Sequence, residues 1–283
     1  MQLYLKGSKI ICMQLLKPII SIALLLSLTA CNGYQKILKS NDTELKYEKA
    51  LEFYNNQDYY KAIQLLDNLR AQTRGTDKAE DVYYYYAYAH YKNEEYILAS
   101  YYFKNFVKSF PKSDKKEKSL YMAAYCKYMQ APPYYLDQST TRAAINELDL
   151  FTEVYPNSKL VEEANKHISE LKKRIEKKEY HKATMYHKME NWEAAAYSLK
   201  VFLNRYPVSK YRENALFKIL DARYNYAQNS IKAKKPERYN EVLDAYDNLI
   251  SEYPKSEFRA KADKIKNKSK AVLEDLKLSN IDQ

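Results

Sequence analysis

The sequence contains very little glycine, cysteine or tryptophan: 3 Gly, 3 Cys and 1 Trp among 283 residues. Glycine normally makes up about 7% of a chain and supplies the positive φ angles of tight β-turns, so its scarcity disfavours a β-sandwich or β-barrel. The glycines at positions 7, 33 and 75 are far apart, so the glycine-rich loops that bind phosphates or dinucleotides are absent. The hydrophobic fraction of 46% is too high for a globally disordered chain.

Tyrosine and basic residues are plentiful instead. The chain has 31 Tyr, and its 47 Lys and Arg against 36 Asp and Glu give a formal net charge of +11. A length of 283 residues corresponds to one or two domains, which is enough to bury a hydrophobic core.

The first thirty residues have the features of a secretory signal peptide. Lys17 precedes an apolar run at 19–28, and small residues follow it. The run has about half the length that a helix needs to cross a bilayer. Met13 is the expected native start, because a signal that begins there has the usual proportions, and residues 1–12 are then an upstream extension.

The signal ends in Leu28-Thr29-Ala30-Cys31, which resembles the bacterial lipobox. In that motif the cysteine becomes the lipidated first residue of the mature protein. The alternative is a secretory signal followed by an ordinary cysteine. We predict lipidation of Cys31, because the spacing, the apolar run and the lipobox agree. Asn32 follows without an acidic cluster, which favours the periplasmic face over the cell surface.

Removing residues 1–30 takes away three lysines and no acids, which leaves 253 residues with a net charge of +8. Cys31 and Cys126 remain, so no disulfide can form when Cys31 is lipidated. Cys126 lies near Met122 and Tyr125 on a helical pattern and is predicted to be a small buried hydrophobe. The basic residues are dispersed, so we predict no nucleic-acid binding; the positive charge suits anionic lipid headgroups or an acidic partner surface.

The mature chain repeats itself. In each copy a small residue, or Val242 in the last copy, stands twelve positions before a proline. Larger side chains stand four and seven positions after that small residue, and this spacing forms one stripe of an α-helix. The proline ends each unit, and the serine two residues later is placed to cap the next helix. An earlier unit carries Arg74 instead of the proline. The four complete copies end in Phe106–Ser113, Phe151–Ser158, Phe202–Ser209 and Leu249–Ser256.

This pattern resembles the tetratricopeptide repeat. Each unit has two helices, and each helix carries one small residue. The two small residues are 12 positions apart in three units, as at Ala87 and Ala99, and 20 positions apart in two units, where the link between the helices is longer. The resemblance implies an all-α fold, a right-handed α-solenoid of five helix pairs plus a C-terminal capping helix. The predicted helices lie near 43–56, 59–72, 77–93, 96–109, 115–130, 139–154, 158–189, 192–205, 210–232, 237–252 and 257–277, with residues 31–42 as lipid anchor and tether and residues 43–283 as the solenoid.

No catalytic motif is present. The sequence contains neither His-Glu-x-x-His nor Cys-x-x-Cys, and its four histidines lack metal-ligand spacing. We therefore predict that the protein is not an enzyme and uses neither a metal nor a cofactor. Paired Glu and paired Lys residues are interpreted as solvated helix faces.

Tyrosines are the candidate binding residues. In a tetratricopeptide array the first helix of each pair lines a concave groove, which places Tyr47 and Tyr54 there from the first unit and Tyr84, Tyr88 and Tyr91 from the second. Tyrosine combines a large contact area with a hydrogen-bonding tip, so this groove suits an extended peptide with aromatic or apolar side chains. The competing interpretation is that these tyrosines belong to the core, as we predict for Tyr96 and Tyr186. Not all of Tyr83–Tyr86 can be buried, because they cover every side of their helix.

The mature chain as a whole resembles the BamD family, lipoproteins of the machine that assembles β-barrels in the outer membrane. The lipobox, the number of units, the long link before Ala144 and the stretch 168–207 carry this resemblance, and residues 34–62 resemble the Bacteroidetes branch. The resemblance implies a non-enzymatic adaptor, lipid-anchored on the periplasmic face of the outer membrane. Its N-terminal repeats would receive unfolded outer-membrane protein clients, and its C-terminal repeats would hold the BamA-type β-barrel insertase, beside other subunits of the machine.

Two other classes of protein share parts of this pattern. A pilotin for a secretin or pilus would have the same lipobox and solenoid, and pull-down from detergent-solubilised membranes distinguishes it by its partner. A SusD-type glycan-binding lipoprotein also contains such repeats, but its large insertions do not fit into 253 residues.

Replacing Cys31 with serine is expected to block lipid attachment, because the lipobox cysteine is the acceptor. The variant should appear either as a soluble periplasmic protein or as an uncleaved precursor. Mass spectrometry of the wild-type protein extracted from membranes checks the assignment directly. An unmodified N-terminus at a residue other than Cys31 would contradict it.

Overall fold

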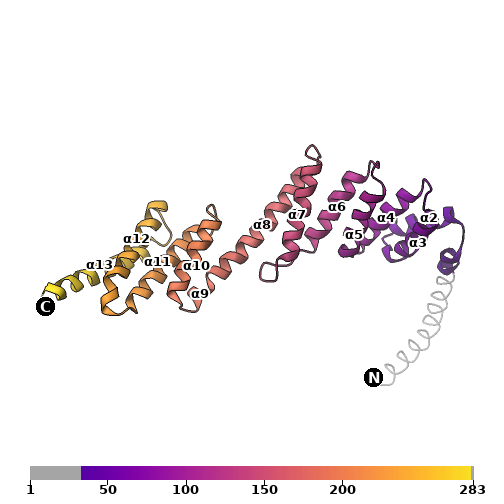
Figure 1. Ribbon diagram of the computed structural model, residues 1–283. Helices are drawn as coiled ribbons and strands as arrows, with labels where there is room; N and C mark the ends of the chain where they lie inside the picture. Colours follow the sequence, from indigo (N-terminus) through magenta and orange to yellow (C-terminus); the bar gives the residue numbers. More distant parts are fainter. Residues whose placement is uncertain (1–32, 282–283) are drawn as a thin grey trace, which may run out of the picture. The chain divides into compact units, whose positions relative to one another are not determined.

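The computed structural model describes residues 33–281, and within this range the chain is helical with short links and no β-strand. The order of the helices is shown in Figure 1. Contacts divide the chain into two compact units: unit 1 contains residues up to 131 and 140–168, and unit 2 contains residues 132–139 and those from 169 onward. The predicted all-α fold of tetratricopeptide-like helix pairs is confirmed. The signal peptide and Cys31 lie outside the described residues.

Unit 1 contains three helix pairs, each made of a first (A) helix and a second (B) helix. The pairs are α2 Thr43–Asn55 with α3 Tyr59–Gln72, α4 Ala79–Lys92 with α5 Tyr96–Ser109, and α6 Lys116–Met129 with α7 Ser139–Val154.

The fourth and fifth pairs and the last helix follow. The fourth pair consists of α8 Val161–Ala183, which begins within unit 1, the single turn α9 Met185–Lys188, and α10 Trp192–Arg205. The fifth pair is α11 Arg212–Gln228 with α12 Lys235–Glu252, separated by the 3₁₀ turn η1 Lys232–Lys234, and the chain continues into α13 Arg259–Ile281.

Close packing at small residues holds the pairs together. Each predicted small position is buried, so neighbouring helices can approach closely, and the larger side chains one and two turns later fill the space beside them. The ten small residues at these positions are at most 4% exposed: Ala50, Ala62, Ala87, Ala99, Ala124, Ala144, Ala183, Ala195, Ala222 and Val242. The apolar stripe predicted from the sequence is therefore confirmed as the core.

In three of the four proline-containing copies the serine, Ser113, Ser158 or Ser209, joins the two helices of its own pair. The Ser113 hydroxyl donates to Glu80 in the first turn of α4 (2.7 Å), and the Ser158 hydroxyl donates to Glu117 in the first turn of α6 (2.5 Å). The same hydroxyl accepts the backbone N–H two residues later, at 3.0 Å for Lys115 and 3.1 Å for Leu160. The serine thus caps the turn that leads into the next helix, three residues before that helix begins.

The predicted single helix over 158–189 is wrong in one respect, because α8 ends at Ala183 and α9 starts at Met185. The Thr184 hydroxyl donates to the carbonyl of His181 (3.0 Å), and such side-chain bonds to the preceding turn bend or interrupt helices.

The long link before α7 packs on the second half of α8. Arg174 donates to the carbonyl of Pro132 (3.0 Å) and Lys178 to that of Leu136 (2.7 Å). The ring of Tyr134 stacks on His181 with a centroid distance of 4.9 Å. The longer link and the longer A helix of the following pair therefore pack against each other within unit 2.

Residues 33–39, within the segment predicted as a tether, form a short helix that packs on the first pair. The Tyr34 hydroxyl donates to the side chain of Gln64 (2.6 Å), and its ring meets Phe53 edge-on at 5.6 Å. Ile37 and Leu38 pack against the same core. Burial, and then the charge of Asp58, raise the pKa of Tyr34 to about 12.

Replacing Ala195 with phenylalanine is expected to destabilise unit 2. Ala195 is fully buried in a cluster with Ala196 and with Ala222 of α11, so it packs closely against the next pair. Overpacking such a contact costs about 1–3 kcal/mol. The melting temperature should fall, whereas Tyr197→Phe, at a position of α10 that is 71% exposed, should leave it unchanged. Equal melting temperatures for the two variants would show that this contact is not close.

Candidate peptide-binding surface

The five predicted tyrosines all lie in unit 1, on the A helices of the first two pairs. Tyr47 and Tyr54 are on α2, and Tyr84, Tyr88 and Tyr91 are on α4. All five are half-buried, so each offers part of its ring to solvent and part to the protein. The A helices bring them together because tyrosines at i, i+4 and i+7 share one helix face.

The rings form a continuous series of contacts from α2 to α4 and on to α6. Tyr54 contacts Tyr85 at 5.5 Å between centroids, and Tyr84 contacts both Tyr85 at 6.1 Å and Tyr88 at 4.7 Å. The series then continues from Tyr88 to Tyr91 at 6.3 Å. These are favourable edge-on and tilted aromatic geometries.

The same series reaches the third pair through residues that the sequence reasoning missed. Tyr91 contacts Tyr125 of α6 at 6.1 Å, and Tyr125 stacks on Tyr128 at 5.6 Å. The ring of His167, at the start of α8 within unit 1, lies 4.1 Å from Tyr128. We call this series the tyrosine ladder; its members are Tyr54, Tyr84, Tyr85, Tyr88, Tyr91, Tyr125, Tyr128 and His167. A signal for α6 was present, because Tyr121, Tyr125 and Tyr128 repeat the spacing of Tyr84, Tyr88 and Tyr91 thirty-seven residues later.

Tyr47 lies beside the ladder, close to a charged cluster. Burial is the main cause that raises its pKa to about 12, followed by the nearby charge of Asp81. Lys115 forms ion pairs with Asp81 (2.7 Å) and Glu80 (3.3 Å), and its ammonium group lies 5.7 Å from the ring of Tyr84. Lys118 lies at the same distance from Tyr88. The ladder is therefore bordered by cations that face aromatic rings.

Tyr88 is the most deeply packed of the predicted residues. Its ring meets the buried Phe103 edge-on at 4.9 Å, and its hydroxyl is buried without a hydrogen-bond partner among residues 33–281. Burial and the neighbouring Tyr84 hydroxyl raise the pKa of Tyr88, and burial raises that of Tyr54 to about 12. Tyr88 and Tyr54 therefore stay protonated at physiological pH.

The core assignments of the other tyrosines are partly corrected. Tyr86 is buried at 4% exposure, whereas Tyr83, Tyr84 and Tyr85 are half-buried, as expected for a run that covers every side of the helix. Tyr186 is 38% exposed and is not a core residue; it lies in α9, after the break at Thr184.

Cys126 is fully buried as predicted, and burial raises the pKa of its thiol to about 12. The described histidines pair with carboxylates or aromatic rings; His187 bonds Asp221 at 2.8 Å. Within residues 33–281 no group of three or more His, Cys, Asp and Glu side chains could hold a metal ion. In the same range no helix has both the length and the apolar character needed to span a membrane.

Substitutions at Tyr88 should separate the contribution of its ring to stability from that of its hydroxyl. Tyr88→Phe is expected to keep or raise the melting temperature, because it removes a buried hydroxyl that has no partner. Tyr88→Ala should lower stability by about 3 kcal/mol or more, because it opens a cavity against Phe103. Thermal unfolding of both variants tests this; a loss of stability in Tyr88→Phe comparable to that in Tyr88→Ala would show that the hydroxyl is bonded in the folded protein.

The chain is similar to several solved structures and matches one family model. Two solved structures are similar: "TPR2AB-domain:pHSP90-complex of yeast Sti1", at 15% identity and TM-score 0.39 over 81% of this chain and 98% of that one, and the P58(IPK) TPR domain, at 16% identity and TM-score 0.39 over 85% and 68%. Likenesses this distant add nothing to the fold, which rests on the helix pairs themselves. No curated protein matches the sequence. Residues 39–238, most of the chain, match the model of the family described as YfiO, an outer membrane lipoprotein, and the chain therefore belongs to the YfiO family of outer membrane lipoproteins.

Proposed function

We propose that this lipoprotein is a non-enzymatic adaptor of the β-barrel assembly machine on the periplasmic face of the outer membrane. In this proposal unit 1 binds unfolded outer-membrane protein clients, and unit 2 binds the BamA-type insertase. The observation that carries the proposal is the tyrosine ladder, which continues without interruption across the A helices of three successive pairs. Membership of the family supports the outer-membrane location and the lipoprotein class in this proposal.

The ladder has the chemistry to hold an extended chain. Its rings are supported from below by core residues such as Phe103 and Phe106, so they lose little side-chain entropy when a ligand covers them. The protonated hydroxyls can donate to backbone carbonyls of an extended peptide, and the ring faces can cover its aromatic or apolar side chains. Lys115 and Lys118 at the border add attraction for carboxylates.

Unit 2 offers a different kind of surface for the insertase. Met185 and Met189 in and after α9 are 48% and 66% exposed, and Tyr197 and Val201 on α10 are 71% and 49% exposed. Methionine and tyrosine are enriched at protein interfaces, and exposed apolar groups of this kind favour a protein partner. This surface supports the assignment of the insertase to the C-terminal repeats.

The proposed lipid on Cys31 would be attached very near the first pair. Only Asn32 separates Cys31 from the helix at 33–39, which Tyr34 ties to α3. Two residues of extended chain reach about 7 Å, so the acyl chains would hold unit 1 close to the lipid headgroups. Unit 1 would then meet clients at the membrane surface.

A double substitution in the ladder tests the client site. Tyr84→Ala with Tyr91→Ala should weaken binding of a synthetic peptide from the C-terminal strand of a barrel protein at least tenfold, because a buried aromatic anchor contributes about 2 kcal/mol. Tyr88 stays in place to keep the contact with Phe103. Fluorescence anisotropy of the labelled peptide measures the affinity.

The matched control is Tyr60→Ala, which removes a tyrosine that is 65% exposed on α3, outside the ladder. This variant should bind the peptide as the wild type does, and both variants should still co-purify with the insertase. Unchanged peptide affinity in a double variant with wild-type circular dichroism would remove the ladder from client binding.

A further inference from the structure

The short helix that precedes α2 fixes the end of unit 1 at which the described chain begins. The Tyr34 hydroxyl donates to Gln64 (2.6 Å), in the first half of α3. The ammonium group of Lys46, twelve residues later, donates to Gln72 (3.5 Å), which is the last residue of α3. The chain therefore enters unit 1 near the start of α3 and passes along this helix toward its end.

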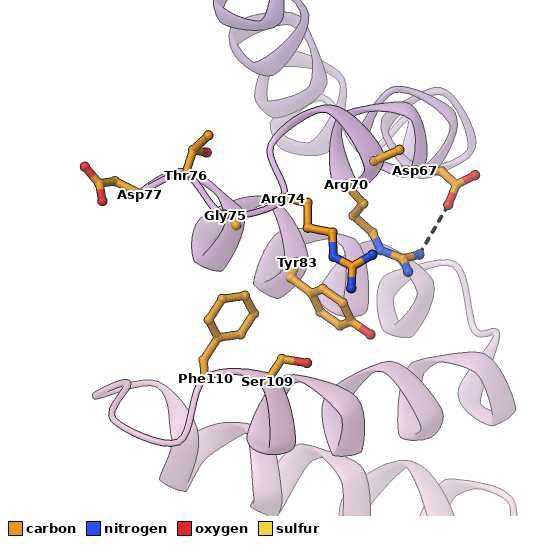
Figure 2. Close-up of a pocket in the computed structure, with 11 residues that line it drawn as sticks. Asp67, Arg70, Arg74, Gly75, Thr76, Asp77, Tyr83, Ser109 and Phe110 are labelled. Carbon is orange, nitrogen blue, oxygen red and sulfur yellow. Dashed lines mark hydrogen bonds and ion pairs between the residues drawn. The ribbon is translucent and has the colours of Figure 1, made fainter.

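The B helices α3 and α5 run in the same direction. Figure 2 shows a pocket lined both by Arg70, near the end of α3, and by Ser109, the last residue of α5. The ring centroid of Tyr83, in the first half of α4, lies 4.8 Å from the guanidinium carbon of Arg70 and 6.0 Å from the ring centroid of Phe110. The ends of α3 and α5 thus lie together, and their starts lie at the opposite end of unit 1, where Tyr34 is found.

Large apolar side chains are exposed at the starts of these two helices. Tyr60 is 65% exposed, Ile97 is 71% exposed and Leu98 is 43% exposed. Tyr101, one turn after Ile97, is 58% exposed. In the last turns of α3 and α5 no large apolar side chain is exposed. The exposed apolar side chains of these helices are therefore gathered toward the end of unit 1 at which the chain enters.

The apolar character of this position is confined to the first two pairs. Tyr60 and Ile97 each stand two positions before the small residue of their B helix. The residues at the same position of the three later B helices are polar: Arg142, Glu193 and Asn240. Packing of the repeats therefore does not require an apolar side chain here. Its presence in the two N-terminal pairs indicates contact with an apolar or interfacial environment at this end.

Positive charge lies beside the apolar side chains. Lys36 and Lys39 of the short helix are exposed, and residues 33–39 contain no acid. Lys61 at the start of α3 forms an ion pair with Asp58 (2.6 Å). Exposed tyrosines and aliphatic side chains flanked by lysines are typical of surfaces that contact the interface of an anionic bilayer.

We propose that the starts of α3 and α5, with the helix 33–39 beside them, lie on the headgroup layer of an anionic phospholipid membrane. We call this surface the membrane-contact face; its members are Lys36, Lys39, Tyr60, Ile97, Leu98 and Tyr101. The apolar side chains enter the interfacial layer, and the lysines contact lipid phosphates.

The choice of a membrane as the occupant rests in part on the proposed lipidation of Cys31. Three residues of extended chain reach about 11 Å, so a lipid on Cys31 would be held within that distance of the Tyr34 backbone. The inference goes beyond the lipid anchor, because it states which side of unit 1 faces the bilayer.

Fluorescence quenching in vesicles of phosphatidylethanolamine and phosphatidylglycerol tests the face in the mature lipidated protein. Trp192→Phe first removes the one tryptophan of the chain, and Ile97→Trp or Lys108→Trp then introduces a single probe. Lys108 is exposed on the same helix, about 16 Å further along its axis. When the lipid acyl chains carry bromine, the emission of Ile97→Trp should fall at least about twofold, and that of Lys108→Trp should not change.

A vesicle-binding assay separates this face from the lipid anchor. The full mature chain with Cys31→Ser should still bind the same vesicles, more weakly as salt is added. Adding Tyr60→Gln and Ile97→Gln should reduce this binding at least about fivefold. The matched control adds Tyr135→Gln and Leu136→Gln, which remove side chains that are 67% and 49% exposed in the link before α7, and should leave the binding unchanged.

The inference is overturned if bromine does not quench Ile97→Trp more than Lys108→Trp. It is also overturned if the Cys31→Ser chain does not bind the vesicles, or binds them equally with and without the glutamines at positions 60 and 97. A blue-shifted emission of Ile97→Trp without quenching would assign the face to a second copy of the chain instead. The Cys31→Ser assay does not depend on the lipid, so its outcome is independent of whether mass spectrometry finds Cys31 lipidated.

Discussion

The close approach of helices at small residues is the constraint on which the rest of this structure depends. Each pair carries a buried alanine or valine on both helices, such as Ala87 and Ala99 in the second pair, and large side chains such as Phe103 and Phe106 fill the space beside them. No disulfide supports the described residues, where Cys126 is a buried thiol. Stability therefore comes from packing between neighbours, and a change at one contact affects the adjoining pair.

Polar contacts at the ends of the pairs complete this packing. Ser113 and Ser158, which follow the B helices α5 and α7, donate to glutamates in the first turns of the A helices α4 and α6. The first pair lacks this serine and uses Lys78 and Glu44 instead. Its link differs in sequence from the later ones and borders a pocket lined by Arg70, Arg74 and Tyr83.

Many of the tyrosines lie on a surface of the A helices that is partly buried and partly exposed to solvent. Stacked A helices bring rings from α2, α4 and α6 within 6.5 Å of one another, with their inner edges on the core and part of each ring exposed. A phenylalanine ladder would expose a wholly apolar strip, which favours aggregation. Tyrosine hydroxyl groups, whose pKa values are raised by burial, keep this surface hydrated and uncharged at physiological pH.

The sequence determined the features that depend on local spacing. The helix period predicted the bounds of α2 to α7 within two residues and all ten small core positions, because the same residues recur at fixed intervals. Residue spacing also predicted that Tyr47, Tyr54, Tyr84, Tyr88 and Tyr91 share the A helices, but not that Tyr125, Tyr128 and His167 extend them.

Contacts between distant segments were decided by the tertiary structure alone. They include the packing of the 33–39 helix on α3, the docking of the 132–139 link on α8, the contact of Ala195 with the next pair, and the packing of Arg70 on the rings of Tyr83, Tyr86 and Tyr102. The physical reason is that periodicity shows which face of a helix is apolar, but not which neighbour covers that face. That neighbour is chosen by the packing of whole helices.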